Sequence, residues 1–176
     1  MLNKIFVWVH IIGFYIMSYF GITAAILNKT KELPSNHYTY YDYCYAYNTL
    51  EVQQNTTLRP LSNAEYRKKL NITRHIYVEI SSNKSYSLPQ LNIILMQNNL
   101  EGHSYARLLT HEMLHIRKYS GDDRYIQLET FKYLYHSNDE HLKQVGITFG
   151  LNMLNEKYDN EYDIKGNLIN YLKEIK

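Results

Sequence analysis

The sequence predicts an α+β fold in which a small mixed sheet packs against helices, preceded by an apolar N-terminal segment. Two short apolar runs, HIYVEI (75–80) and NIILMQ (92–97), predict strands of the sheet. Later stretches repeat apolar residues at helical spacing, and they predict helices over about 104–118, 123–136, 137–157 and 162–175. A chain of 176 residues has room for one such domain and a short extension.

The N-terminal segment, residues 5–27, contains no Asp, Glu, Lys or Arg. As a helix its 23 residues would extend ~34 Å, enough to cross a hydrocarbon core of ~30 Å. This length favours a transmembrane helix over a cleaved signal peptide, whose apolar region is shorter and ends in small residues such as Thr23 and Ala25. A buried helix of a soluble domain is the third alternative. We therefore predict an N-terminal membrane anchor or signal over residues 1–30.

A tyrosine-dense segment follows the predicted anchor. Tyrosines alternate along YTYYDYCYAY (38–47), and this period of two predicts a half-buried strand in a juxtamembrane segment, residues 31–60. The stretch LSNAEYRKKL (61–70) predicts a short helix, because Ser62 and Glu65 have the spacing of a capping box. The main domain is expected over residues 61–176.

Composition excludes several classes of function. The 19 basic and 17 acidic residues nearly cancel, so the net charge of +2 gives no broad positive field for nucleic acid. Cys44 is the only cysteine, which excludes an internal disulfide and a cysteine-based zinc site. A metal site in this chain must therefore use histidines and carboxylates.

The stretch LLTHEMLH (108–115) has the spacing of such a site. On a helix, His111 and His115 are about 40° apart around the axis and ~6 Å apart along it, so both imidazoles can reach one ion. Glu112 points about 100° away from His111, beside the ion rather than onto it. A zinc ion with three protein ligands lowers the pKa of a water molecule at its open position to about 7, and Glu112 could take that proton as general base.

The motif His111-Glu112-Met113-Leu114-His115, with the uncharged residues before it, resembles the zincin metallopeptidases. That resemblance implies a zinc-dependent peptidase with His111 and His115 as metal ligands and Glu112 as the catalytic acid and base. It also implies that an edge strand just before the motif helix binds extended substrate by main-chain pairing, and NIILMQ occupies the matching place in the sequence.

The third ligand is predicted to be Glu129. If the helix after the YSGDD turn runs back beside the motif helix, Glu129 lies at the level of a metal held between His111 and His115. A glutamate from a second helix is the ligand in the glutamate branch of the zincins. Asp122 and Asp123 are the competitors, resembling the aspartate ligands of other zincins, although capping of the second helix also explains them. Tyr105, Tyr125 and Tyr133 are the candidates for stabilising a transition-state oxyanion.

The function predicted from the sequence is a zinc metallopeptidase that acts on peptides or exposed protein segments. We expect one Zn²⁺ per chain, a membrane location through residues 5–27, and a catalytic domain on the extracytoplasmic side, or secretion if the N-terminus is cleaved. No nucleic-acid partner is expected. The alternative is a membrane-tethered, noncatalytic binding or structural protein in which the histidine pair is incidental or holds a structural ion.

Overall fold

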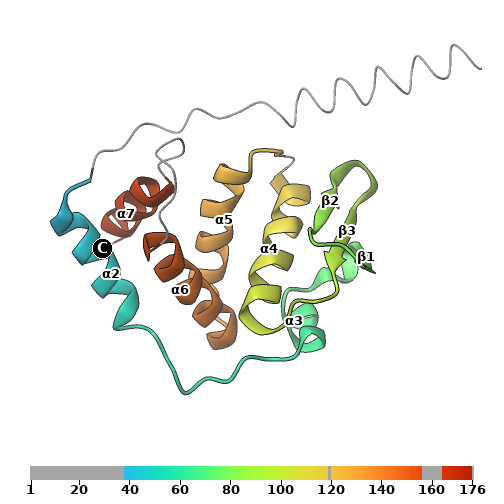
Figure 1. Cartoon of the computed structure of the whole chain (residues 1–176), viewed down its shortest axis with the longest axis horizontal. Coiled ribbons are helices and arrows are strands. Elements are labelled where there is room, and N and C mark those ends of the chain that lie inside the picture. The colour runs from blue at the N-terminus through green and yellow to red at the C-terminus, as the bar shows by residue number, and fades with distance from the viewer. Residues whose placement is uncertain (1–37, 119, 156–163, 176) are drawn as a thin grey trace, which may run out of the picture.

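The computed structural model describes residues 38–118, 120–155 and 164–175, and these residues form an α+β fold with a mixed sheet at one end (Figure 1). The predicted anchor, residues 5–27, lies outside the described residues. Within the described ranges, no helix is both long and apolar enough to cross a membrane. The helices are α2 (Tyr40–Glu51), α3 (Asn63–Lys69), α4 (Gly102–Lys118), α5 (Asp123–Tyr135), α6 (Glu140–Asn155) and α7 (Ile164–Glu174).

The sheet contains β1 (Ile76–Ile80), β2 (Tyr86–Leu88) and β3 (Ile93–Gln97), in the order β1-β3-β2. β1 is parallel to β3 and β2 is antiparallel to it, so the sheet is mixed as predicted. The sequence analysis did not predict β2, which lies between the two predicted strands. The strand NIILMQ was expected at the edge, and this was wrong: β3 is central and β2 forms an edge.

The tyrosine-dense segment is also different from its prediction. It forms the helix α2 instead of a strand, because Thr39 and Asp42 make a complete capping box at its start. Helical spacing then buries Ala46 and Leu50 fully, while Tyr43 and Tyr47 pack at the border of the core. α2 lies against α6 and α7, and it contributes to a buried cluster that these helices share.

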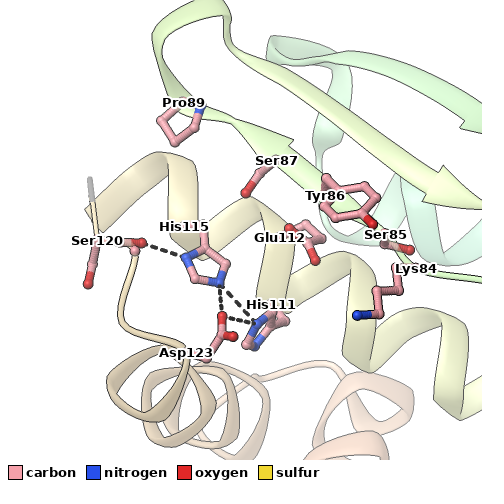
Figure 2. Close-up of a pocket in the computed structure, with 11 residues that line it drawn as sticks. Lys84, Ser85, Tyr86, Ser87, Pro89, His111, Glu112, His115, Ser120 and Asp123 are labelled. Carbon is pink, nitrogen blue, oxygen red and sulfur yellow. Dashed lines mark hydrogen bonds and ion pairs between the residues drawn. The ribbon is translucent and has the colours of Figure 1, made fainter. Parts of the chain in front are cut away.

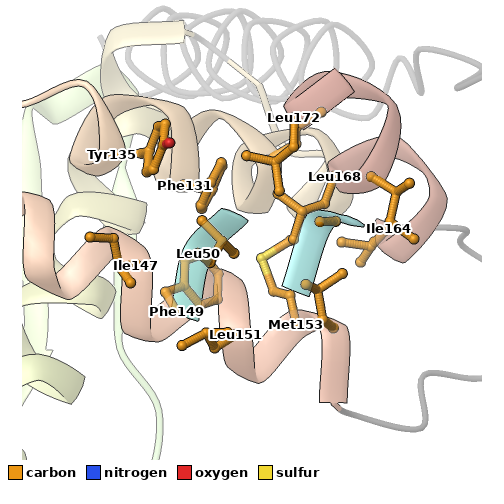
Figure 3. Close-up of a cluster of buried hydrophobic side chains, with 14 residues drawn as sticks. Leu50, Phe131, Tyr135, Ile147, Phe149, Leu151, Met153, Ile164, Leu168 and Leu172 are labelled. Carbon is orange, nitrogen blue, oxygen red and sulfur yellow. The ribbon is translucent and has the colours of Figure 1, made fainter. Parts of the chain in front are cut away.

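Two clusters of buried side chains hold the fold together, and α5 and α6 contribute to both. One cluster joins α2, α5, α6 and α7, with Phe131 and Met153 fully buried (Figure 3). The other joins α3, β3 and α4 to the α5–α6 pair, with Met96 and Met113 fully buried. The motif helix α4 therefore lies between the sheet and the other helices, where both its faces are packed (Figure 1).

Local signals set where these helices begin. The predicted capping box of Ser62 and Glu65 is confirmed at the start of α3. α6 begins at Glu140 because the Asp139 carboxylate accepts the backbone N–H groups of His141 and Leu142. α4 begins at Gly102, whose φ of +59° favours glycine and where a Cβ would lie 3.2 Å from Pro60.

Candidate metal centre

The motif helix α4 buries its functional residues more deeply than a surface helix would. His111, Glu112 and His115 are 8, 6 and 8% exposed, and the apolar neighbours Leu109 and Met113 are fully buried. Leu109 and Met113 pack into the cluster between sheet and helices. The same packing therefore fixes the rotation of α4 and turns its histidines toward one side of the helix.

His111, His115 and Asp123 converge on a single point (Figure 2). The two Nε2 atoms are 3.0 Å apart, and Asp123 Oδ1 lies 3.0 Å from Nε2 of His115 and 3.6 Å from Nε2 of His111. A tetrahedral zinc ion with bonds of about 2.0–2.2 Å holds its donor atoms about 3.3–3.5 Å apart. Two imidazoles and a carboxylate are also ligands that zinc prefers, so the three groups fit this metal.

The backbone after α4 orients one of the histidines. Nδ1 of His115 donates a hydrogen bond to the Ser120 carbonyl, which leaves Nε2 of the neutral ring as the lone-pair nitrogen that faces the convergence point. Nδ1 of His111 is buried and has no hydrogen-bond partner among the described residues. The two rings thus differ at Nδ1, which makes a hydrogen bond in His115 and none among the described residues in His111.

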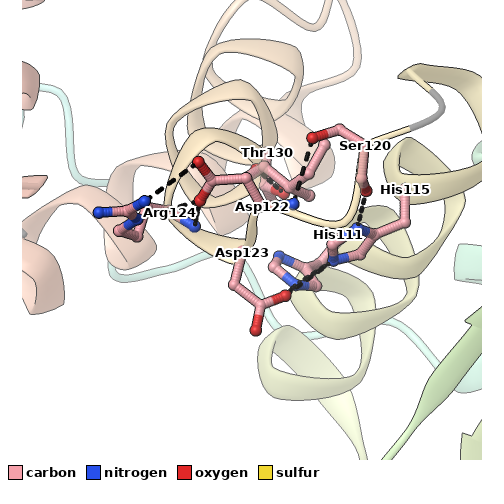
Figure 4. Close-up of polar contacts among 8 residues, drawn as sticks. His111, His115, Ser120, Asp122, Asp123, Arg124 and Thr130 are labelled. Carbon is pink, nitrogen blue, oxygen red and sulfur yellow. Dashed lines mark hydrogen bonds and ion pairs between the residues drawn. The ribbon is translucent and has the colours of Figure 1, made fainter. Parts of the chain in front are cut away.

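A second set of polar contacts fixes the residue next to Asp123 (Figure 4). Asp122 is 7% exposed and caps α5 by accepting the Arg124 N–H at 3.1 Å. The same carboxylate accepts Nε of the Arg124 guanidinium, and the Asp122 N–H donates to the Ser120 hydroxyl at 3.2 Å. Residues 120–124 thus form a turn that these hydrogen bonds stabilise, and the turn places the Asp123 carboxylate beside the histidines.

Charges in the turn shift the pKa values of the converging groups. Hydrogen bonds from His111 and then from His115 hold the pKa of Asp123 well below its ordinary value. Burial of His115 opposes its protonation, but the hydrogen bonds to Asp123 and to the Ser120 carbonyl outweigh burial and raise its pKa. Without a metal ion, an ionised Asp123 therefore stabilises the protonated form of His115.

Glu112 faces the same cleft from the sheet side of the histidines (Figure 2). Burial raises its pKa, an effect that the charge of His111 and a hydrogen bond from the Ser87 hydroxyl partly offset. The cleft has a volume of about 410 Å³, and the β1–β2 segment forms its opposite wall through Lys84, Ser85, Tyr86 and Ser87. A group with a raised pKa beside three converging ligands is suited to proton transfer.

Glu129, the predicted third ligand, is not brought to the histidines. Its carboxylate binds Lys118 at 3.0 Å and Lys132 at 3.2 Å, while the carboxylate that lies beside both histidines is that of Asp123, the competitor. Glu129 follows Asp123 by six residues, which turns it about 120° around the α5 axis and moves it ~9 Å along it. The prediction of Glu129 rested on its level along the helix and left out this rotation.

The other predicted residues are also distributed differently. None of Tyr105, Tyr125 and Tyr133 is among the residues that line the cleft. The Tyr105 hydroxyl instead donates a hydrogen bond to the hydroxyl of Tyr77 in β1. Ser87 and its neighbours were missed in the sequence because a strand of three residues is too short to show a pattern. The only available signal was the alternation of polar and apolar residues in SYSL (85–88).

No known protein family, curated protein or solved structure matches the chain.

Proposed function

We propose that this protein is a zincin-like zinc metallopeptidase, with His111, His115 and Asp123 as metal ligands and Glu112 as general base. The observation that carries the proposal is the convergence of three zinc-type donor atoms within 4.8 Å of one another, beside a buried carboxylate that is not one of them. A purely structural metal site has no need of such a carboxylate. Asp123 replaces Glu129 in the proposed ligand set because its oxygen is the one that lies near both imidazoles.

The chain's own groups account for the steps of peptide hydrolysis. A zinc ion held by the three ligands would supply Lewis-acid activation at the scissile carbonyl and its attacking water. The Glu112 carboxylate accepts a proton from that water and then gives it to the departing amine nitrogen. Ser87 donates to Glu112, and this hydrogen bond holds the carboxylate in place while the carboxylate is ionised.

The edge strand β2 is suited to hold the substrate. The backbone edge of β2 away from β3 has no strand partner among residues 38–118, and β2 borders the cleft that contains Glu112. An extended peptide could pair with this edge and lie across the cleft. We propose this role for β2 in place of β3, which was expected to have it.

Metal content and a matched set of variants test the proposal in the full-length chain. We expect one zinc per wild-type chain, loss of more than about 100-fold in zinc affinity for Asp123→Asn, and near-normal affinity for the control Glu129→Gln. Glu112→Gln should keep the metal and lose about 10²–10⁴-fold in hydrolysis of a fluorogenic peptide library.

The results for wild type and variants distinguish the metallopeptidase from a noncatalytic protein. A wild-type chain that is metal-free and takes up no zinc would contradict the metal site. Normal zinc binding with no hydrolysis by wild type would favour the noncatalytic protein with a structural ion. Loss of zinc in Glu129→Gln with normal binding in Asp123→Asn would overturn the ligand set.

A further inference from the structure

The sheet has an apolar face that no described element covers. The strand register places three rows of side chains on the outer face: Ile76–Ile93–Leu88, Val78–Leu95–Tyr86 and Ile80–Gln97. Side chains on the inner face point the other way, so that Ile94 and Met96 are fully buried and Ser87 reaches Glu112. Ile76, Val78 and Tyr86 are 56, 41 and 48% exposed, and Leu91 beside the sheet is 57% exposed. We call seven apolar side chains on this side of the sheet the outer sheet face: Ile76, Val78, Tyr86, Leu88, Leu91, Ile93 and Leu95.

This composition is unusual for a sheet face in contact with water. A sheet that is packed on one side alternates apolar inward residues with polar outward residues. The run IILM in β3 is instead typical of a strand covered on both faces, and here α4 covers only one of them. The sequence of the strands therefore indicates a second apolar neighbour.

The size of the outer sheet face argues against a second copy of this chain as that neighbour. The exposed fractions amount to on the order of 400 Å² of side-chain surface, about half of the ~800 Å² that each partner buries in a standard interface. The patch is nevertheless as large as the greatest apolar patch expected on a monomer. A surface of this size suits a neighbour that is already held nearby.

Charge around the outer sheet face favours an anionic surface. Glu79 is the only acidic residue between positions 71 and 100, and it lies on the inner face of the sheet, where its half-exposed side chain forms an ion pair with Arg67. Arg74 lies two residues before β1 and Lys84 lies between β1 and β2; both are exposed and have no ion pair among the described side chains, and Lys84 also lines the cleft. An apolar patch with an exposed cation at its border and no acidic residue on the same face is the pattern of a protein surface that contacts anionic lipid headgroups.

We propose that the outer sheet face docks on a lipid bilayer that contains anionic headgroups. The predicted anchor would hold the domain close to such a bilayer, since residues 28–39 span at most ~40 Å when extended, comparable with the diameter of a domain of this size. This inference does not depend on the metal site. Tyr86 and Leu88 of β2 belong to the outer sheet face, and β2 also lines the cleft, so docking would place the opening of the cleft beside the membrane surface.

A fluorescent label on an outer-sheet-face residue of the full-length chain tests the proposal, because its emission depends on whether it contacts water or lipid. In a Cys44→Ser background, Ile76→Cys or Val78→Cys is labelled with an environment-sensitive fluorophore and mixed with vesicles that carry a quencher on their acyl chains. The vesicles contain phosphatidylcholine with phosphatidylserine, or phosphatidylcholine alone. The matched control is Val52→Cys, which is 81% exposed directly after α2, the helix at the other end of the domain from the sheet (Figure 1).

Docking predicts a blue shift and loss of fluorescence for the labels at 76 and 78 but not at 52, with larger effects when phosphatidylserine is present. Binding of the chain to vesicles without quenching at 76 or 78 would overturn the proposal, because residues 5–27 alone would then explain binding. Failure of the chain to bind vesicles at all would overturn it as well. Disulfide formation between two Val78→Cys chains without vesicles, together with no quenching, would identify a second copy as the neighbour.

Discussion

Asp122 has no atom in the proposed ligand set, yet it holds the backbone from which Asp123 reaches the histidines. Its carboxylate accepts both the N–H and the guanidinium of Arg124, and its own N–H is tied to Ser120. Ser120 in turn accepts Nδ1 of His115 through its carbonyl. One turn therefore positions two of the three proposed ligands, so a change at Asp122 should alter the affinity for a metal ion.

We predict that Asp122→Ala weakens zinc binding by about 10-fold and that Asp122→Asn, which keeps an oxygen for the cap, weakens it less. Asp139→Ala is the matched control, because Asp139 caps α6 in the same way but lies outside the cleft. Titration with zinc gives the affinities and thermal unfolding gives the stabilities. Equal zinc affinity in all three variants, with lower stability, would limit Asp122 to a structural role.

At the scale of elements, the close approach of α5 and α6 depends on Gly146. A Cβ at this position would lie 2.6 Å from the Tyr135 nitrogen and 2.9 Å from the Leu134 carbonyl carbon. Both atoms belong to the backbone, which cannot turn aside as a side chain can. The pair α5–α6 contributes to both buried clusters, so separating these helices would loosen the whole domain.

Gly146→Ala should therefore lower the free energy of unfolding by about 1–3 kcal/mol, although alanine favours the helix. Gly150→Ala is the comparison, because its Cβ would meet the side chains of Phe131 and Leu50 instead of backbone atoms. Side chains can reorient, so we expect a smaller loss there. Chemical denaturation of the two variants measures the difference, and an equal or smaller loss in Gly146→Ala would contradict this explanation.

The contact of α2 with α7 depends on pH through Asp42. Its carboxylate pairs with Lys173 at 2.6 Å and caps α2 through Thr39. These hydrogen bonds, led by the one from Lys173, lower the pKa of Asp42 from its ordinary 3.8 to about 2. Because the folded pKa is depressed, the stabilisation is complete above the ordinary pKa and is lost as the pH falls from about 4 toward 2.

Asp42→Asn should accordingly lower the unfolding temperature at about pH 6, while the difference from wild type shrinks as the pH approaches 2. The ion pair is partly exposed, so added salt should reduce part of the effect. Thermal unfolding of both proteins across this range is the measurement. A constant difference between them at every pH would show that Asp42 acts through packing instead of charge.

At the scale of the whole molecule, the sequence predicted the helices whose apolar residues recur at regular spacing. It did not predict the elements whose structure depends on a local cap or on contacts with distant segments. The helices from 104 onward have apolar residues at helical spacing over several turns, and the structure confirms them within a few residues. α2 was predicted as a strand because the alternation of its tyrosines hid the cap formed by Thr39 and Asp42. β2 is a strand only because β3 pairs with it.

In the candidate metal centre, too, the residues within one helix could be predicted from the sequence, and the residue beyond the turn could not. His111, Glu112 and His115 could be predicted because one helix carries all three. Asp123 could only be one of several alternatives, since its position depends on a turn that contacts between Ser120, Asp122 and Arg124 stabilise. Glu129 was preferred on its distance along α5, and only the structure showed which side of α5 faces the histidines.

Because the centre joins α4 to the start of α5, metal binding should stabilise the whole domain. A ligand that binds only the folded chain stabilises it by about 2.7 kcal/mol at 100 times its dissociation constant, or on the order of 10 °C in unfolding temperature. We therefore expect zinc to raise the unfolding temperature of the metal-stripped protein and chelation to reverse the increase. Glu112→Gln should respond as wild type does, because it keeps all three ligands, whereas Asp123→Asn should lose most of the response. An equal response in Asp123→Asn and wild type would mean that zinc binds elsewhere.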